Sequence, residues 1–472
     1  MNKAVGRVRL SVAVAAGKAT GASGRLLRIG GGATWPGLIA RRIDPDILKH
    51  TVGVSKAKKI VITGSNGKTT TARMVSALAN TAVGKAGRVA HNRTGANLLH
   101  GVTAVAVHAA NVFGKLDKDV LIFEVDEATM PLVVPEIRPD VVIITNIFRD
   151  QLDRFGELYA VARGIDKVLE GLPAEATIIL NGNDPQVASL GAGAKARKLY
   201  FGLETTEVGT PVPEQSADVI RCIRCNHDLD YKVAYLSHLG LYRCPNCGYT
   251  LPKLDVAATQ VQLAPDGEGP STVGLITPDG EMQLRIPLPG LHNVYNAAAA
   301  IAAMHAAGLS LASVQTAFDG LKTAFGRMEK ITAGDKTIFL SFVKNPTSFN
   351  LVLRLIAQHP GRKQLYIAFS RTVVDGEDFA WLWDVDFEEL TPQVAQVMCS
   401  GNKAEEEALR LKYAGVPAKH ITTNPDMEKA LNAALAEVQP GGTLHILCGY
   451  TPNQQLRRIM QKRGWVKHYW QE

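Results

Sequence analysis

The 472-residue chain has no run of eighteen apolar residues, so no membrane-spanning helix is expected. It has no convincing secretory leader, because the apolar stretch LSVAVAAG is short and is ended by Lys18. Its six cysteines are too few for a disulfide framework, and four of them form two Cys-x-x-Cys pairs. Internal repeats and low-complexity linkers are also missing. These absences favour a globular protein of the reducing cytoplasm.

Acidic residues are scarce at the start of the chain. Residues 1–60 hold twelve Lys and Arg against Asp44 and Asp46, a net charge of +10, whereas the whole chain carries +8. The remaining residues therefore sum to −2. A basic segment on a near-neutral body suggests an anionic surface nearby, either lipid headgroups or nucleic acid. The alternative is a solvated helix whose charge has no partner.

Apolar runs without polar alternation predict a parallel β-sheet covered on both faces. The runs lie within residues 58–79, 119–128, 139–156 and 176–185, and an alanine-rich helix over 293–308 comes later, closed by Gly308. The pattern restarts after FGRME, with strands expected at 337–343, 364–370, 394–400, 420–423 and 443–449. The fold class is therefore α/β, with a second, smaller α/β domain at the C-terminal end. We divide the chain into 1–55, 56–325 and 326–472.

The stretch TGSNGKTTT reads as a phosphate-binding loop between a strand and a helix. Glycines at 64 and 67 let backbone N–H groups approach phosphate, and the helix N-terminus adds partial positive charge. Lys68 is suited to neutralise the β- and γ-phosphates of ATP, and Thr69 to bind Mg²⁺. The predicted nucleotide-binding set is Gly64, Asn66, Gly67, Lys68, Thr69 and Thr70.

Acidic residues end the next predicted strand, LIFEVDEA. Glu124 stands at its carboxyl end, where a side chain faces the phosphate crevice of a parallel sheet. We therefore predict Glu124 as a second Mg²⁺ ligand, the alternative being a structural acid. Asp126 and Glu127 are candidates to cap the next helix instead.

Two cysteine pairs, CIRC and CPNC, stand eighteen residues apart in the middle of the chain. Two turns that each offer two thiolates complete a closed tetrahedron, so Cys222, Cys225, Cys244 and Cys247 predict a structural zinc ribbon inserted over about 205–255. An iron centre is the main rival, and His227 and His238 are weaker alternative ligands. The few basic residues of this segment give a weak footprint for nucleic acid, so we expect no nucleic-acid partner.

The motifs TGSNGKTTT, FEVDEA, TNIFRDQLDRFGE, NGNDP, GLHNVYNAAAA and FGRME occur in the order found in Mur ligases, which this chain resembles from about residue 55 to the end. The resemblance implies a central ATPase domain and a smaller C-terminal domain. Two features depart from the usual Mur pattern. Little chain precedes the phosphate loop, so no separate domain for a UDP-linked precursor is expected, and the cysteine insertion is extra.

The insertion and the segments SFVKNPTSFN and DGEDFAWLWDVDFE resemble the MurT family, the Mur-ligase-like subunits of lipid II isoglutaminyl synthase. This resemblance implies a peptidoglycan-synthesis ligase that works as a heterodimer with a GatD-type class I glutaminase. The implied reaction amidates the α-carboxyl of D-glutamate in the lipid II stem peptide, through an acyl phosphate, to give D-isoglutamine. The cofactors implied are ATP, Mg²⁺ and Zn²⁺.

The resemblance also suggests roles for particular residues. Asn293 matches the adenine-binding asparagine of the family, although it could equally cap its helix, and Arg327 is a candidate to reach ATP from the hinge between the domains. Gln151 stands where other members have histidine. The carbamylated lysine of the family has no placed counterpart, so a second metal site stays open.

Ammonia must come from solution or from another chain, because Cys399 and Cys448 lack the glycine-flanked elbow of a triad nucleophile and are typical strand-end cysteines. In the family, the second aspartate of the D-G-x-D motif completes the glutaminase's Cys-His pair in trans. Here that residue is Asp378. The alternative is a turn, which Asp-Gly forms on its own account.

Lipid II lies in the inner leaflet of the cytoplasmic membrane, so the basic N-terminal segment predicts peripheral contact with that surface. Two other functions compete with this interpretation. One is a stand-alone amino-acid ligase of the folylpolyglutamate synthetase type, against which the cysteine insertion and the D-G-x-D-x-x-W stretch argue. The other is an ATPase that binds nucleic acid through the ribbon.

Overall fold

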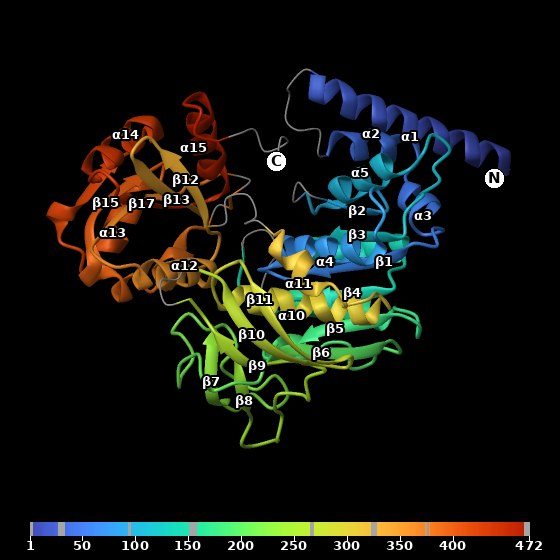
Figure 1. Ribbon diagram of the computed structural model, residues 1–472, viewed down its shortest axis with the longest axis horizontal. Helices are drawn as coiled ribbons and strands as arrows, with labels where there is room; N and C mark the ends of the chain where they lie inside the picture. Colours follow the sequence, from blue (N-terminus) through green and yellow to red (C-terminus); the bar gives the residue numbers. More distant parts are fainter. Residues whose placement is uncertain are drawn as a thin grey trace.

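The computed structural model describes residues 3–26, 34–92, 96–150, 158–264, 269–321, 328–372, 375–376 and 378–466, with side chains from residue 6 and without those of 25 and 26. Two α/β bodies lie side by side, with the insertion projecting from the first (Figure 1). None of the helices in these ranges is long and apolar enough to cross a bilayer.

The larger body is built on a nine-stranded sheet of order β11-β10-β9-β6-β5-β4-β1-β3-β2. Its parallel part comprises β1 (Lys58–Thr63), β2 (Val89–His91), β3 (Val120–Glu124), β4 (Val141–Ile144), β5 (Thr177–Asn181), β6 (Arg197–Leu203) and β9 (Val256–Gln262). Strands β10 (Ser271–Thr277) and β11 (Gly280–Ile286) extend it in antiparallel fashion. Strands β1, β3, β4 and β5 carry almost wholly buried side chains, which confirms the prediction of a doubly covered parallel sheet.

Helices cover both faces of this sheet. One core packs α4 (Lys68–Val83), α10 (Leu291–Ala306) and α11 (Val314–Asp319) on the strands. The other packs α3 (Ile47–Thr51), α5 (Leu99–Ala109), α6 (Met130–Ile137) and α8 (Leu158–Glu170). The short α9 (Pro185–Ala188) comes after β5. The alanines of α10 are buried throughout Ala297–Ala303, which places the predicted alanine-rich helix inside the core.

The N-terminal helices form a third layer outside α5. Helices α1 (Lys3–Leu26) and α2 (Trp35–Ile43) bury Ala13, Val14 and Ala40 against Val107 of α5. The space is tight, since a Cβ on Gly17 would lie 2.8 Å from the Pro36 carbonyl oxygen. The basic segment is therefore packed on the body along one side rather than solvated all round, although sequence alone suggested no such packing.

The smaller body has a six-stranded sheet of order β12-β13-β17-β14-β15-β16. Its strands are β12 (Glu329–Ala333), β13 (Lys336–Phe342), β14 (Lys363–Ala368), β15 (Val394–Ser400), β16 (Ile421–Asn424) and β17 (Thr443–Cys448). Helices α12 (Pro346–Gln358) and α13 (Ala404–Tyr413) cover one face, and α14 (Met427–Glu437) and α15 (Tyr450–Lys462) cover the other. All five strands predicted here are present, and β12 is an antiparallel addition that the sequence pattern did not predict.

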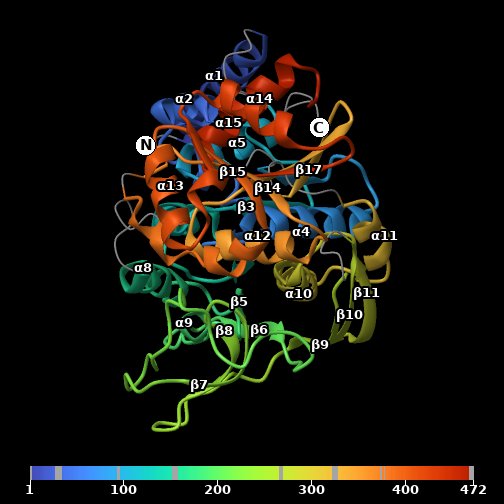
Figure 2. The ribbon, with the colours of Figure 1, turned by 90° about the vertical axis from the view of Figure 1, so that its left-hand side faces the viewer.

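The cysteine insertion forms a small module of its own. Its hairpin, β7 (Asp230–Leu236) with β8 (Leu239–Arg243), is separate from both sheets. Figure 2 shows it projecting below β6 and β9. Around the sulfurs lies a small apolar cluster of Cys222, Cys244, Leu229, Tyr242 and Tyr249. The hairpin residues Val233, Tyr235 and Leu239 pack instead into the large core on the sheet.

Candidate active site in the cleft between the two bodies

The phosphate loop joins β1 to α4 and is held by the segment after β4. The Ser65 N–H donates to the Asn146 carbonyl oxygen (2.9 Å), and the Asn66 N–H donates to Asn146 Oδ1 (2.8 Å). Thr145 Oγ1 donates to the Asn66 carbonyl oxygen (2.7 Å). Because these bonds engage both N–H and C=O groups of the loop, its backbone conformation is fixed before an anion binds.

Two glycines are required by this geometry. Gly64 has φ 124°, and a Cβ there would lie 2.2 Å from Thr145 Oγ1. Gly67 has φ 88°, and a Cβ there would lie 2.4 Å from Asn296 Oδ1. Both positions therefore combine a backbone conformation that favours glycine with a close neighbour, as the sequence motif predicted.

Lys68 opens α4 and turns its ammonium back over the loop. It contacts the Gly64 carbonyl oxygen and lies 3.1 Å from both oxygens of Glu127. Burial alone would lower the pKa of Lys68, but the carboxylates of Glu127 and Asp126 raise it above its usual value. Conversely, Lys68 and Lys344 hold the pKa of the buried Glu127 below its usual value against the effect of burial. A fully charged cation–anion pair thus occupies the phosphate end of the site.

Glu124 ends β3 directly beside the loop, because β1 and β3 pair in parallel with Ile62 opposite Glu124. Its side chain is 3% exposed and accepts from Asn97 Nδ2 at 3.3 Å. Asn92 fixes its backbone through two bonds of 2.8 Å. Asp126 accepts from the Ala128 N–H and caps the short helix at Glu127–Thr129, whereas Glu127 pairs with Lys68 instead of capping.

The C-terminal body closes the site from the opposite side. Lys344, two residues beyond the end of β13, forms an ion pair with Asp150, whose side chain is 13% exposed. Burial raises the pKa of Asp150 by more than Lys344 lowers it. The side chains of Asn345 and Asn66 meet at 3.4 Å, and Asn345 caps α12 through a capping box with Ser348. The segment SFVKNPTSFN therefore contacts the phosphate loop directly.

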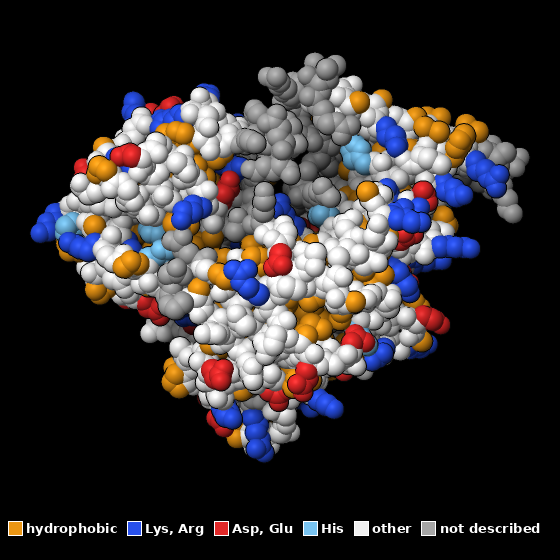
Figure 3. Space-filling model, viewed as in Figure 1, with side chains coloured by type: hydrophobic (Ala, Val, Ile, Leu, Met, Phe, Trp, Pro, Cys, Tyr) orange, Lys and Arg blue, Asp and Glu red, His pale blue; other side chains and the backbone are white. Residues whose placement is uncertain are grey.

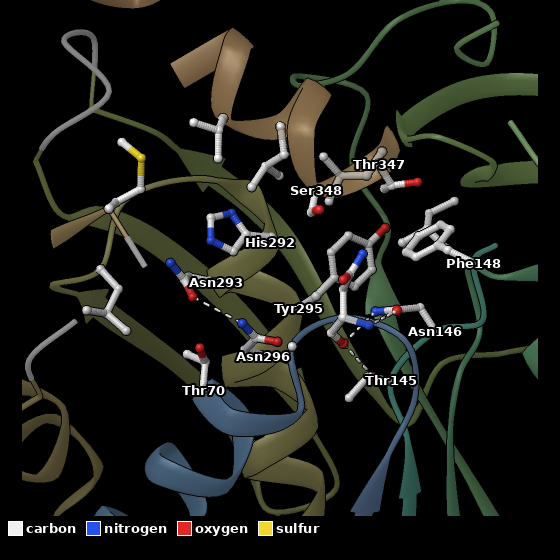
Figure 4. Close-up of a pocket in the computed structure, with 18 of the residues that line it drawn as sticks. Thr70, Thr145, Asn146, Phe148, His292, Asn293, Tyr295, Asn296, Thr347 and Ser348 are labelled. Carbon is white, nitrogen blue, oxygen red and sulfur yellow. Dashed lines mark hydrogen bonds between the residues drawn. The ribbon is translucent and has the colours of Figure 1, made fainter. Parts of the chain in front are cut away.

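A pocket lies between the phosphate loop, the start of α10 and the start of α12. Figure 4 shows His292 and Asn293 facing it from α10, with Thr347 and Ser348 across from them. Asn293 donates to the Pro289 carbonyl oxygen (2.7 Å) and accepts from Asn296 (3.1 Å). It does not cap α10, because Gly290 is the N-cap residue and Asn293 accepts no backbone N–H there.

Asp378 lies away from this pocket, on the surface of the C-terminal body. It is exposed, and one carboxylate oxygen accepts from the Ala380 N–H (2.8 Å). Asp375 instead faces inward, where it accepts from the Thr451 N–H (2.9 Å) and contacts Thr372. The two aspartates of the motif thus differ: Asp375 fastens the loop, and Asp378 presents a carboxylate to solvent.

The four cysteines of the insertion converge. Their sulfur atoms all lie within 4.8 Å of one another, with Cys222–Cys247 at 3.5 Å and Cys225–Cys244 at 3.4 Å. Four thiolates around one zinc stand at roughly 3.8 Å from each other, given a Zn–S bond of about 2.3 Å, so the cluster fits that ion. The two histidines lie elsewhere: His227 bonds to the Asp228 carbonyl oxygen, and His238 contacts Asp184.

Several predicted residues lie apart from these contacts. Arg327, the division near residue 325 and Gln151 lie outside the described residues. Thr69 is half-buried on the first turn of α4, and Thr70 lines the pocket. Cys399 and Cys448 are fully buried, and burial raises the pKa of both thiols, which disfavours the nucleophilic thiolate.

The sequence pattern did not reveal several residues of the site. Lys344 and Asn345 come from the C-terminal body, where Lys344 pairs with Asp150 and Asn345 meets Asn66 of the loop. These residues lie in the motifs RDQLD and SFVKNPTSFN, but the sequence does not indicate that the two motifs contact each other. Tyr295 and Asn296 also line the pocket, but the alanine-rich pattern around them indicated only a buried helix. One helical turn brings Asn296 within hydrogen-bonding distance of Asn293.

Comparison with known families places the fold in a class. The family model "Mur ligase middle domain" matches residues 62–304, and "MurT ligase C-terminal" matches 342–452. The solved structure of a pseudomurein peptide ligase type C from Methanothermus fervidus shares the fold, with a TM-score of 0.65 at 22% identity over 89% of this chain and 81% of that one. The fold and the loop are those of the Mur ligase class.

Curated relatives narrow this class. The MurT subunit of the glutamine-hydrolysing lipid II isoglutaminyl synthase of Streptococcus pneumoniae is 31% identical over 94% of this chain and 95% of its own length. The corresponding subunit of Staphylococcus aureus is 30% identical over 84% of this chain and 86% of its own. This chain therefore belongs to the Mur ligase family and, within it, to the MurT subunits.

Proposed function

We propose that the protein is the ATP-dependent synthetase subunit of a lipid II isoglutaminyl synthase. It would convert the α-carboxyl of D-glutamate in the stem peptide to the amide of D-isoglutamine. The observation that carries this proposal is the cleft in which Asn345 of the MurT-type C-terminal domain meets Asn66 of the Mur-type phosphate loop, while the neighbouring Lys344 pairs with Asp150. The division of the chain at 55 and 325 belongs to the same proposal.

The chemistry requires activation, because hydroxide is a poor leaving group. A carboxylate oxygen attacks the γ-phosphorus of ATP, which releases ADP and leaves an acyl phosphate. Ammonia then attacks the acyl carbon, and phosphate departs with one of the original carboxylate oxygens. Catalysis of phosphoryl transfer is largely positioning and charge neutralisation, which a buried loop with a charged lysine can supply.

In this proposal Lys68 exchanges Glu127 for the β- and γ-phosphates, and Thr69 and Glu124 hold Mg²⁺. Support for Lys68 comes from its charged state and from its position over Gly64. Asn293 is assigned to adenine because its side chain lines the pocket at the start of α10. Arg327 is retained as an ATP contact on the basis of its motif alone.

The ammonia would come from a GatD-type class I glutaminase bound as a heterodimer. Asp378 is assigned as the third member of that enzyme's triad, where it would orient the imidazole. Its exposed carboxylate on the surface of the C-terminal body supports this role, because a residue that acts in trans must reach a partner.

The test is co-expression with a candidate glutaminase, followed by incubation with lipid II, ATP and glutamine. The expected product carries the small mass decrease that replacement of OH by NH₂ produces, and it forms only when all three substrates are present. If the single chain instead joined an amino acid to its substrate with ATP alone, the protein would be a stand-alone ligase of the folylpolyglutamate synthetase type.

The four-cysteine cluster is proposed to hold a structural zinc ion. The donor set is four sulfurs with no open position, and the apolar cluster around these sulfurs is small. Elemental analysis should give one zinc per chain. Iron in its place would favour the rival centre.

A site at the inner face of the cytoplasmic membrane is also proposed. The outer side of α1 carries an exposed apolar stripe of Val8, Val12, Ala15 and Ala19, with Arg7 beside it. Figure 3 shows hydrophobic side chains and Lys or Arg along this helix. Phe113, 76% exposed, stands next to Gly114, where an added Cβ would lie against Leu10 of α1. Apolar residues flanked by cations fit an anionic lipid surface.

Point variants test this better than deletion, because removal of α1 would uncover the apolar layer around Val14. The double variant V8D/V12D should lose binding to vesicles that contain anionic lipid, whereas V54D, at a 73% exposed position outside α1, should bind as the parent does. Equal sedimentation of the parent and V8D/V12D would reject the membrane contact. Binding of the parent to zwitterionic vesicles but not to anionic ones would reject the role of the basic residues.

A further inference from the structure

The tip of the cysteine-stapled hairpin forms one wall of the pocket. Leu236 and Leu239 pair across the turn between β7 and β8, and both line the cavity with Phe148 and Tyr295. Ser237, in the turn, has φ 52°. The insertion is therefore part of the nucleotide pocket as well as an appendage below the sheet.

The hairpin tip is fastened to the motif NGNDP. Asn183 Nδ2 donates to the Gly240 carbonyl oxygen (3.1 Å), and the Gly240 N–H donates to the Asn183 carbonyl oxygen (2.9 Å). His238 is fully buried, stands 3.4 Å from Asp184 and packs edge-on against Phe148. Asp184 also accepts from the Ile147 N–H (2.9 Å), in the segment that holds the phosphate loop.

The same insertion reaches the C-terminal body through Glu214. The side chain of Glu214 is only 6% exposed. Its Oε1 accepts from the Ser237 N–H and from Arg354 of α12, each at 2.6 Å, and its Oε2 accepts from Asn350 at 3.3 Å. Arg354 keeps its charge, because Glu214 raises its pKa against the effect of burial. One carboxylate thus joins the hairpin turn to α12.

Helix periodicity connects this joint to the pocket. Thr347 and Leu351 line the cavity, while Asn350 and Arg354, three positions further along α12, face Glu214. Asn350 also bonds twice to Asp386, in the segment that begins with Asp378. The contacts therefore run from the hairpin tip through α12 to the surface segment.

We propose that Glu214 is a positioning residue that latches the cysteine insertion to α12. Through it the insertion sets how the C-terminal body closes over the nucleotide that Leu236 and Leu239 help to enclose. This gives the insertion a role in nucleotide binding, and it rests on the proposed function. Ser216 Oγ donates to the same carboxylate at 3.4 Å, and a nearly buried carboxylate that accepts from four donors costs much more to remove than an exposed one.

The test compares E214Q with E207Q, an exposed glutamate of the same insertion whose side chain no described contact uses. Binding of ADP with Mg²⁺ is measured by calorimetry, and compaction on ADP binding is measured by small-angle scattering. E214Q should bind ADP at least about tenfold more weakly and should lose the compaction, while its zinc content stays at the parental value. E207Q should match the parent in all three.

A variant of Arg354, the partner of Glu214 on α12, shows whether the E214Q defect comes from loss of this contact or from misfolding of the insertion. R354Q leaves the insertion unchanged and should reproduce the E214Q defect, and the double variant should be no worse than either single one. Parental affinity and compaction in folded R354Q and E214Q would overturn the latch. Failure of the parent itself to bind ADP would instead refute the proposed function, so the two failures are distinguishable.

Discussion

The phosphate loop and the segment around Asp378 are both recognised from short glycine-containing motifs, yet their surroundings in the structure are opposite. The phosphate loop is largely buried, Lys68 is paired with Glu127, and the loop backbone is hydrogen-bonded to the segment that follows β4. The carboxylate of Asp378 is exposed and has one local bond to the Ala380 N–H. The difference suggests a division of labour, in which activation of the carboxyl is completed inside this chain and the supply of nitrogen is completed by another.

The largest effect on activity, a loss with both nitrogen sources, should come from a substitution in the buried phosphate loop. Lys68→Met removes the cation that we propose neutralises the phosphates, and it leaves the largely buried Glu127 without its ion-pair partner. We expect glutamine-driven and ammonium-driven turnover to fall together by about 10³-fold or more. Steady-state phosphate release measures both. Lys85→Met, at an exposed position just past the far end of the same helix, is the matched control and should be inert.

A substitution at the exposed Asp378 should distinguish turnover that uses glutamine from turnover that uses added ammonium. If Asp378 completes the triad as proposed, Asp378→Asn should lower glutamine-driven turnover by about 10⁴-fold, the cost of the wrong imidazole tautomer. Turnover with added ammonium should persist, because the cleft around Lys68 is untouched. Equal loss with both sources in a folded variant would remove Asp378 from the triad and make the segment structural.

Loss of the metal site should affect stability first. Cys244→Ser breaks the four-sulfur cluster at a fully buried position. A loss of about 3 kcal/mol corresponds to a melting temperature lower by roughly 6–12 °C in a domain of this size. Calorimetry with zinc analysis measures both quantities. Cys448→Ser, which is buried outside the cluster, should lose no zinc, and an unchanged metal content in Cys244→Ser would contradict the site.

The smallest effect concerns Asp386, next to the Asp378 segment. Burial raises the pKa of Asp386 to about 6, and the nearby carboxylates of Glu214, Glu389 and Glu388 add to this rise. The guanidinium of Arg354 opposes it. The folded state therefore binds a proton that the unfolded state has already released, so stability should fall as the pH rises from about 4 to 6. Asp386→Asn should flatten this slope in urea-unfolding curves and should be more stable than the parent at pH 7. A parental slope in the variant would place the titration elsewhere.

Local motifs allowed much of this structure to be predicted. The parallel strands, α4 and the four-cysteine cluster follow from patterns within short stretches, because glycine geometry, burial and thiolate spacing are local properties. The Lys344–Asp150 pair, the latch at Glu214 and the hairpin wall could not be found in that way. Each of these joins residues far apart in the chain, and each exists only because two bodies or an insertion meet.

The central claim is that this chain converts a carboxyl oxygen into a phosphate leaving group before nitrogen enters. Lipid II with both oxygens of the D-glutamate α-carboxyl labelled with oxygen-18, treated with the assembled pair, ATP and glutamine, tests it directly. The account predicts that the inorganic phosphate released carries one labelled oxygen for each amide formed. Amide formation accompanied by unlabelled phosphate would contradict it.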